Sequence, residues 1–405
     1  MIYKIKLSGK KIFSNFFYII IFSVFLIPYS ISTGLSANYS FIFLPLLIIL
    51  FSGKIKIPSE NIIIFILFFS FILLMGIIYQ YKLFIYLDRR LISFLIFMTM
   101  FSYVVIDIGK DKIDSFKIAV VLIVLYFVIL KIGNFFIYTE LEKGNLKYYV
   151  GNSRYGFVYL LAFWIVYFYK PGSKLVSILK TFTILLILGG IFITYSRTTI
   201  LSFLFSFGLF YFSVLFKNDK RFFYKLFFFL LIPSILIVLL ILFEKIFTNT
   251  YNYFSDTLFT YFSIDGLFGF FERLSDSKTS MGFRVLLLGK IIDYVSLNPF
   301  TGSGFLGCWI MFDDLKCSAH NQYADVLFRT GFVGFYIYLY ILYKTSVYLR
   351  HNHQDLFYGF VSILLYGFFH ETFKMSQGAF ILAFMIGMMA TSNRNLNLKF
   401  SRKRK

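Results

Sequence analysis

The sequence predicts an all-α polytopic membrane protein. Of its 405 residues, 59% are hydrophobic and only 15% are charged, with a mean hydropathy of +0.79, whereas soluble domains are about half apolar and a quarter charged. Apolar windows such as residues 61–78 and 224–243 are long enough to cross a hydrocarbon layer of roughly 30 Å. These windows lack the alternation of apolar and polar residues that marks membrane β-barrels.

We expect about twelve transmembrane helices from the apolar segments. They lie near residues 15–33, 37–52, 61–79, 91–108, 117–138, 154–170, 176–195, 198–216, 222–243, 323–343, 355–370 and 377–391. The first segment follows basic residues, as a signal sequence does, but no cleavage site of small residues follows it. It is therefore predicted to be retained as the first helix.

The positive charge of the chain predicts its orientation in the membrane rather than a nucleic-acid partner. The formal net charge is +21, and more than half of the Lys and Arg residues fall in alternate short loops and at the two ends. The positive-inside rule then places both termini in the cytoplasm. His351 and His353 fall in a cytoplasmic turn, where we expect solvated side chains rather than a metal site.

One long polar segment interrupts the spans and divides the chain. Residues 1–243 are predicted to form transmembrane helices 1–9, residues 244–322 one large loop on the outer side, and residues 323–405 helices 10–12 with a basic cytoplasmic tail. Within the loop, Phe283–Ser296 has an apolar and a polar face, which predicts a helix docked across the mouth of the bundle. A long loop among short ones is typical of a functional segment.

The same loop contains a glycine-rich stretch and both cysteines. "GSGFLG" (302–307) matches a dinucleotide fingerprint in its letters, but no strand leads into it, so we interpret it as a turn after Pro299. Cys308 and Cys317 are predicted to lie in an oxidising compartment, where a disulfide and two free thiols are equally plausible.

Five residues predicted on the outer side are candidates for chemistry. Arg197 lies in a very short turn between two spans and Arg284 on the predicted loop helix, and arginine suits the binding of phosphate groups. His320 precedes a span and can act as a base near neutral pH. His370 and Glu371 end another span. Each of these residues also has a simpler structural interpretation. The Arg197 side chain can snorkel and Arg284 can be exposed at the surface, His320 can cap the next helix, and His370 and Glu371 can form a polar pair at the membrane interface.

Polar and small residues also follow His320 inside the predicted span. Asp325 and Arg329 are four residues apart, so we expect a mutually neutralising pair on one face of the helix. Gly331 and Gly334 are predicted to allow close packing between helices.

The order of these motifs resembles the signature of the O-antigen polymerase and O-antigen ligase superfamily. The resemblance rests on "RVLLL" (284–288), "NPFTGSGFLG" (298–307) and "HNQYADVLFRTGFVGFYIYL" (320–339), together with the short turn carrying Arg197 and the late outer loop. It is strongest over residues 280–345, and "HNQYADVLFRTG" is more similar to the polymerases.

The resemblance implies a fold like that of the lipid-dependent (GT-C-type) glycosyltransferases, in the bacterial inner membrane. It implies an enzyme that moves a glycan from undecaprenyl pyrophosphate to an acceptor hydroxyl, without metal or cofactor. His320 and Arg284 are then the catalytic candidates, as base and as clamp on the diphosphate. Arg197 and Glu371 are the candidates for substrate binding, with Glu371 orienting His320 or the acceptor.

We therefore expect an O-antigen polymerase that joins lipid-linked repeat units at the periplasmic face. Its expected partners are the undecaprenyl-pyrophosphate-linked oligosaccharide, membrane lipid and a chain-length regulator, with no nucleic acid. The nearest alternative is the ligase that transfers polymer to lipid A–core. A flippase or exporter of the lipid-linked unit is a third, less favoured because few charged residues lie within the spans.

Overall fold

The computed structural model describes residues 9–26, 60–80, 86–102, 108–137, 155–193, 196–215, 280–311, 319–372 and 375–402. Every regular element in these ranges is helical. The α-helices are α1 (Gly9–Leu26), α3 (Glu60–Met75), α4 (Leu87–Ser102), α5 (Lys110–Ile137), α7 (Gly156–Phe168), α8 (Lys174–Ile193), α9 (Arg197–Leu215), α13 (Ser280–Leu297), α14 (Gln322–Asn352), α15 (Gln354–Gly367) and α16 (Ser376–Arg402). A π-helical turn, η2 (Gly76–Gln80), extends α3, and a 3₁₀ turn, η6 (Cys308–Met311), precedes α14.

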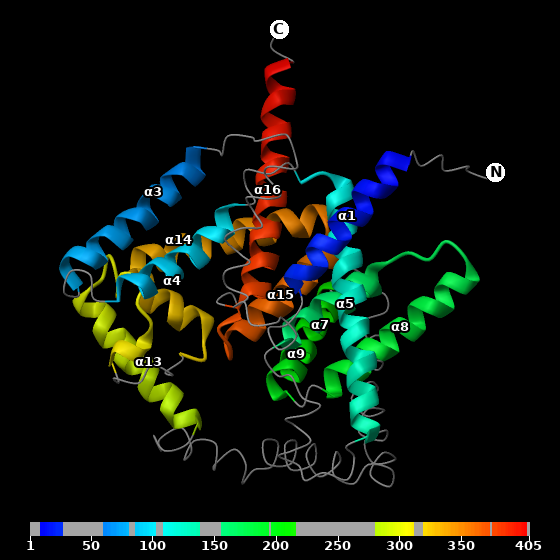
Figure 1. The fold of residues 1–405 in the computed structure, drawn as a ribbon, viewed down its shortest axis with the longest axis horizontal. Coiled ribbons are helices and arrows are strands. Elements are labelled where there is room, and N and C mark those ends of the chain that lie inside the picture. The colour runs from blue at the N-terminus through cyan, green and yellow to red at the C-terminus, as the bar shows by residue number, and fades with distance from the viewer. Residues whose placement is uncertain are drawn as a thin grey trace.

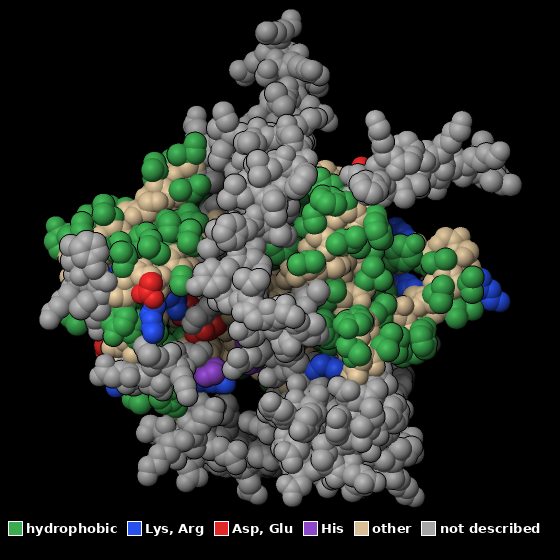
Figure 2. Space-filling view, in the orientation of Figure 1, with side chains coloured by type: hydrophobic (Ala, Val, Ile, Leu, Met, Phe, Trp, Pro, Cys, Tyr) green, Lys and Arg blue, Asp and Glu red, His purple; other side chains and the backbone are tan. Residues whose placement is uncertain are grey.

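The all-helical prediction is confirmed for these ranges, and ten of the predicted spans coincide with helices. The other two, 37–52 and 222–243, lie outside the described residues. Among the described residues, three segments are long and apolar enough to cross a membrane: Lys110–Lys131, Lys174–Phe192 and Gln322–Asn352. Five shorter apolar helices accompany them. Hydrophobic side chains cover much of the visible surface of the described helices (Figure 2), as expected for a protein that faces lipid.

The described helices form one bundle (Figure 1), and aromatic side chains join them. Phe116 of α5 stacks on Phe384 of α16 with ring centroids 4.2 Å apart, and Phe25 of α1 stacks on Phe380 at 4.6 Å. A second aromatic group surrounds Trp164 of α7, whose indole donates to the Ser362 hydroxyl of α15. Such pairs stabilise packing by about 0.5–1.5 kcal/mol each beyond the apolar area that they bury.

Helix α13 confirms the helix predicted within the outer loop and extends it slightly at both ends. Leu287, Ile291 and Val295 recur at spacings of four, so they line one face of the helix. That face packs on Ala324 and Phe328 of α14. The loop helix is therefore anchored to the first turns of α14, next to His320.

Helix α14 is broken at Gly331, whose backbone angles (φ 68°, ψ −174°) are not helical. A left-handed φ favours glycine because an L side chain there meets the backbone. A Cβ at Gly331 would also lie 2.4 Å from the Pro299 carbonyl oxygen. The prediction that Gly331 serves helix packing is thus wrong: it allows a break in the helix. Gly334 does pack closely on another helix, because a Cβ there would lie 3.2 Å from Ile72 of α3.

Candidate functional site

The glycine-rich turn after Pro299 fills the break in α14. The Ser303 amide donates to the Phe328 carbonyl (2.7 Å), the Phe305 amide donates to the Arg329 carbonyl (3.0 Å), and the Phe332 amide donates to the Pro299 carbonyl (2.8 Å). At the break, the Phe328 and Arg329 carbonyls and the Phe332 amide lose their usual partners within the helix, and the turn provides hydrogen-bond partners for them. The predicted turn is confirmed, and it is buried from Gly302 to Cys308.

Positive backbone angles at two glycines and one aromatic side chain hold the turn in place. Gly302 (φ 53°) and Gly304 (φ 59°) permit the tight path, and a Cβ at Gly302 would lie 2.3 Å from the Phe328 carbonyl oxygen. Phe305 is fully buried between α3 and α4, in contact with the Phe94 and Phe97 rings. The turn is thus a fixed part of the bundle.

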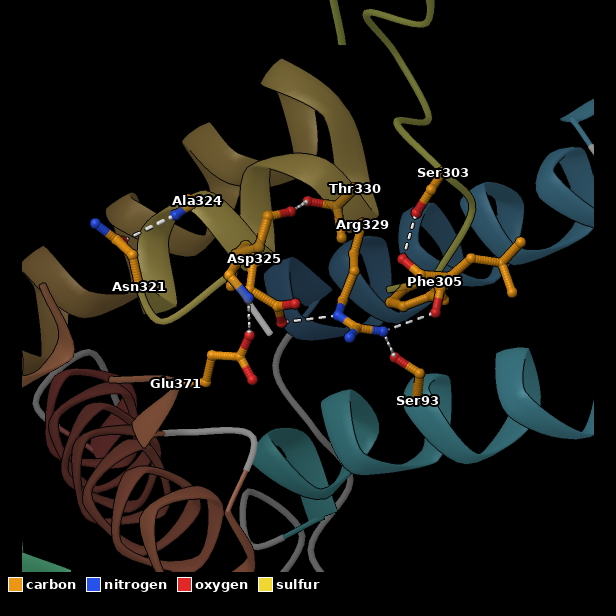
Figure 3. A network of polar contacts seen from close by, with 12 residues as sticks. Ser93, Ser303, Phe305, Asn321, Ala324, Asp325, Arg329, Thr330 and Glu371 are labelled. Carbon is orange, nitrogen blue, oxygen red and sulfur yellow. Dashed lines mark hydrogen bonds and ion pairs between the residues drawn. The ribbon is translucent and has the colours of Figure 1, made fainter. Parts of the chain in front are cut away.

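Arg329 connects three parts of the site (Figure 3). Its Nε donates to Asp325 Oδ2 at 2.7 Å, and its Nη1 donates to the Ser93 hydroxyl of α4 (2.7 Å) and to the Phe305 carbonyl (2.9 Å). Arg329 is 6% exposed and Asp325 3%. The predicted neutralising pair is confirmed, and it also connects α14 to α4 and to the turn. Removing one member of a buried pair costs about 3–5 kcal/mol.

His320 stands at the start of α14 with an exposed side chain and a left-handed backbone (φ 49°). The cap of the helix is the next residue: Asn321 Oδ1 accepts hydrogen bonds from the amides of Tyr323 (2.9 Å) and Ala324 (3.1 Å). The interpretation of His320 as the capping residue is therefore wrong. Because Asn321 caps the helix, capping does not explain the histidine at position 320.

Glu371 holds the backbone beside His320. The carboxylate, 8% exposed, accepts a hydrogen bond of 2.7 Å from the Ala319 amide (Figure 3). Its neighbour His370 stacks on the Tyr366 ring, with centroids 4.8 Å apart. The structure thus brings the predicted residues Glu371 and His320 into one local arrangement, through the main chain.

The two candidate arginines occupy separate helices. Arg284 lies in the first turns of α13 and is half-buried. Arg197 is the first residue of α9, after the short turn that the sequence predicted, and its side chain lies outside the described residues. The convergence of Arg197, Arg284 and His320 on one centre therefore stays a prediction.

Two arginines of α4 that the sequence analysis did not single out also lie at the turn. Arg90, at the start of α4, is 1% exposed and donates from Nη1 to the Gly304 carbonyl at 3.1 Å. The guanidinium of Arg89 lies over the Trp309 ring, 4.9 Å from its centroid. The doublet "RR" directly before an apolar span was the available signal, because such charges are costly at a membrane unless they are partnered or functional.

Cys308 is buried at the end of the turn, whereas Cys317 lies outside the described residues, so their pairing stays untested. Within the described part of the chain, no three His, Cys, Asp or Glu side chains group as ligands for a metal ion. Metal independence remains an expectation.

Residues 182–339 match the family described as O-antigen ligase. The matched segment includes Arg197, Arg284, His320 and the broken helix, while Glu371 follows it. No curated protein matches the chain. Over residues 182–339, the chain is therefore similar to the superfamily of O-antigen polymerases and O-antigen ligases, a group of glycosyltransferase-like membrane enzymes.

Proposed function

We propose that the protein is an O-antigen polymerase that transfers a glycan from undecaprenyl pyrophosphate to the hydroxyl of another lipid-linked repeat unit. The observation that carries this proposal is the setting of His320. The helix cap is provided by Asn321, and the backbone at Ala319 is fixed by Glu371, so an exposed imidazole is held at a defined place. This arrangement suits a general base, and His320 itself lies within the matched family segment.

In the proposed reaction, the acceptor hydroxyl oxygen forms a bond to the anomeric carbon of the donor glycan. The bond from that carbon to the diphosphate breaks, and the lipid diphosphate leaves with the electron pair. His320 takes the proton of the hydroxyl. Arg284 and Arg197 bind the diphosphate oxygens as negative charge develops, because a guanidinium stays protonated and can bind them in a bidentate way.

Glu371 acts in this proposal as a positioning residue. It contacts the main chain beside His320 and sets the direction of the imidazole. A general base must lie within hydrogen-bond reach of the proton that it removes, and proper placement contributes to a gain of about 10²–10⁴-fold. Both termini are proposed to lie in the cytoplasm of a cell with an inner membrane, with the site facing the periplasm and a chain-length regulator as a partner.

The second candidate is the ligase, because the matching family is described by that activity. The two enzymes differ in the acceptor, and a gene deletion separates them. Loss of a polymerase leaves lipopolysaccharide with a single repeat on the core. Loss of a ligase leaves bare core and accumulated polymer on the carrier lipid. A strain without carrier-linked units in the periplasm would contradict both and indicate a flippase.

A further inference from the structure

Two short segments lie side by side at the start of α14 and the end of α15: residues 319–323 and residues 367–371. Three contacts connect them: Gly367 with Gln322, Phe368 with Tyr323, and Glu371 with Ala319. Residue numbers rise along one segment where they fall along the other, so the two segments run in opposite directions. His320 lies on the first segment, between the contact made by Phe368 and the contact made by Glu371.

Phe368 presents an open aromatic ring beside His320. The residue is 53% exposed, and its ring lies against the Tyr323 ring with centroids 4.5 Å apart and planes inclined by 40°. The Tyr323 hydroxyl donates to the Leu364 carbonyl at 2.8 Å, which fixes the ring that supports Phe368. We call Phe368 and Tyr323 the aromatic platform. Its supporting ring is held in place, and its outer ring is open to a ligand.

Polar side chains border the platform, which distinguishes it from a phenylalanine that faces lipid. His320 is exposed and His370 is partly exposed. By contrast, Phe182 of α8, 58% exposed, shares its face of the helix with the exposed Leu179 and Leu185. A sugar fits the mixed surface, because its C–H groups stack on the negative face of an aromatic ring while its hydroxyls reach polar groups at the edge. An acyl chain has no hydrogen bonds to offer such groups.

We propose that the aromatic platform binds the acceptor sugar ring that carries the attacking hydroxyl. This inference rests on the proposed function: His320 takes the proton of that hydroxyl, so the ring that carries it lies next to His320. Tyr323 follows His320 by three residues, and at most about 10 Å of chain separates them. A sugar stacked on the platform can therefore place a hydroxyl at the imidazole. Phe368 is then a specificity-determining residue that selects sugars with an apolar C–H face.

The first test uses Phe368→Trp as a reporter in the full-length protein in phosphatidylcholine nanodiscs. The sequence has only two tryptophans, and Trp164 is fully buried, so the background emission changes little. The probe is the repeat-unit oligosaccharide released from the surface polysaccharide of the strain. A saturable change in tryptophan emission is expected, because the sugar displaces water from the indole. Phe182→Trp is the matched control at nearly the same exposed fraction, and its emission should not change.

The second test measures the affinity for the same oligosaccharide by calorimetry. Phe368→Leu should weaken binding about three- to tenfold, because leucine keeps an apolar side chain and lacks the aromatic face. Phe368→Tyr keeps the ring and should keep the affinity. Equal affinity in Phe368→Leu and the wild type would overturn the proposal.

Undecaprenyl diphosphate, which carries no sugar, separates the two kinds of occupant. An emission change in Phe368→Trp as large with this lipid as with the oligosaccharide would overturn the proposal and assign the platform to the lipid chain. The emission test decides the matter if Phe368→Leu does not fold. Polymer formation is assayed separately. A deletion phenotype that contradicts a polymerase leaves sugar binding measurable, whereas normal polymer without an emission change would reject the platform alone.

Discussion

Glu371 and Ala319 are 52 residues apart in sequence, yet the Glu371 carboxylate accepts the Ala319 amide at 2.7 Å in a buried position. This bond joins the segment that follows α15 to the residue before His320. Disruption of the bond should move the histidine while leaving the helices in place.

Glu371→Ala is expected to lower polymer formation by about tenfold or more, because the Ala319 amide loses its acceptor at a cost of about 1–3 kcal/mol. Glu371→Gln keeps an acceptor oxygen and should retain most of the activity. The measurements are turnover and its pH profile in membranes with matched expression. A glutamine variant as inactive as the alanine variant would show that the charge, rather than the position, is required.

His320→Ala should leave the protein folded and able to bind the lipid-linked donor, while polymer formation falls by about 10²-fold or more. His320→Asn should be equally impaired, because Asn321 already caps the helix. Ladders of lipopolysaccharide on a gel provide the readout. Near-normal ladders from His320→Asn would end the catalytic assignment.

Arg284→Lys should impair the reaction although the charge is kept. A lysine ammonium is a point charge and cannot replace the planar fork of a guanidinium on a diphosphate. The loss should appear partly in donor binding, measured with undecaprenyl diphosphate. Lys290→Arg, an exposed change on the same helix, is the control. Unchanged kinetics in Arg284→Lys would make Arg284 an ordinary surface residue.

Gly331→Ala should lower the free energy of unfolding by about 1–3 kcal/mol, because alanine must adopt a left-handed φ and its Cβ would meet the Pro299 carbonyl. Gly289→Ala is the matched control. Gly289 lies within α13 with nothing within 4 Å of a Cβ, so alanine should leave stability unchanged or raise it slightly. Thermal unfolding in detergent measures both, and equal melting temperatures would contradict the account of the helix break.

Stability should also depend on pH through His353, which lies between α14 and α15. Burial lowers the pKa of His353 and the Lys117 ammonium lowers it further, against the opposing effect of Asp355 and Asp114. Lys117 itself pairs with Asp355 at 2.5 Å. Because the folded-state pKa is lower than the unfolded one, the unfolded state binds more protons as the pH falls.

Stability is therefore expected to be full above about pH 6.5 and to decline below it as His353 is forced to charge. His353→Gln should reduce this decline, whereas His351→Gln, at an exposed position, should not. Melting temperatures between about pH 5 and pH 8 test the difference. Identical pH profiles for His353→Gln and the wild type would refute the assignment.

The sequence predicted what depends on local pattern. Apolar periodicity located the helices, including α13, and the spacing of Asp325 and Arg329 predicted their pair. Packing by distant residues could not be read in this way. Gly331 looks like a packing glycine in the sequence, and only the approach of Pro299, 32 residues earlier, makes it a helix break.

The same limit applies to the candidate site. His320, Arg284 and Glu371 were recognisable by residue type and by their place at the ends of apolar segments. Two contacts connect elements far apart in the chain: the bond between Glu371 and Ala319 and the contact of Arg89 with Trp309. No pattern of residue spacing in the sequence predicts them. Asn321 follows His320 directly in the sequence, and its role as the helix cap became evident only from its extended backbone and the two hydrogen bonds of its side chain.

The turn that fills the break in α14 also constrains the order in which the protein is assembled. Its docking partners are Phe94 and Arg90 on α4, which is synthesised early, and the carbonyls of Phe328 and Arg329, which are synthesised after the turn itself. Neither partner alone satisfies the turn. A ribosome must therefore synthesise α14 at least as far as Arg329 before the turn can dock on both partners.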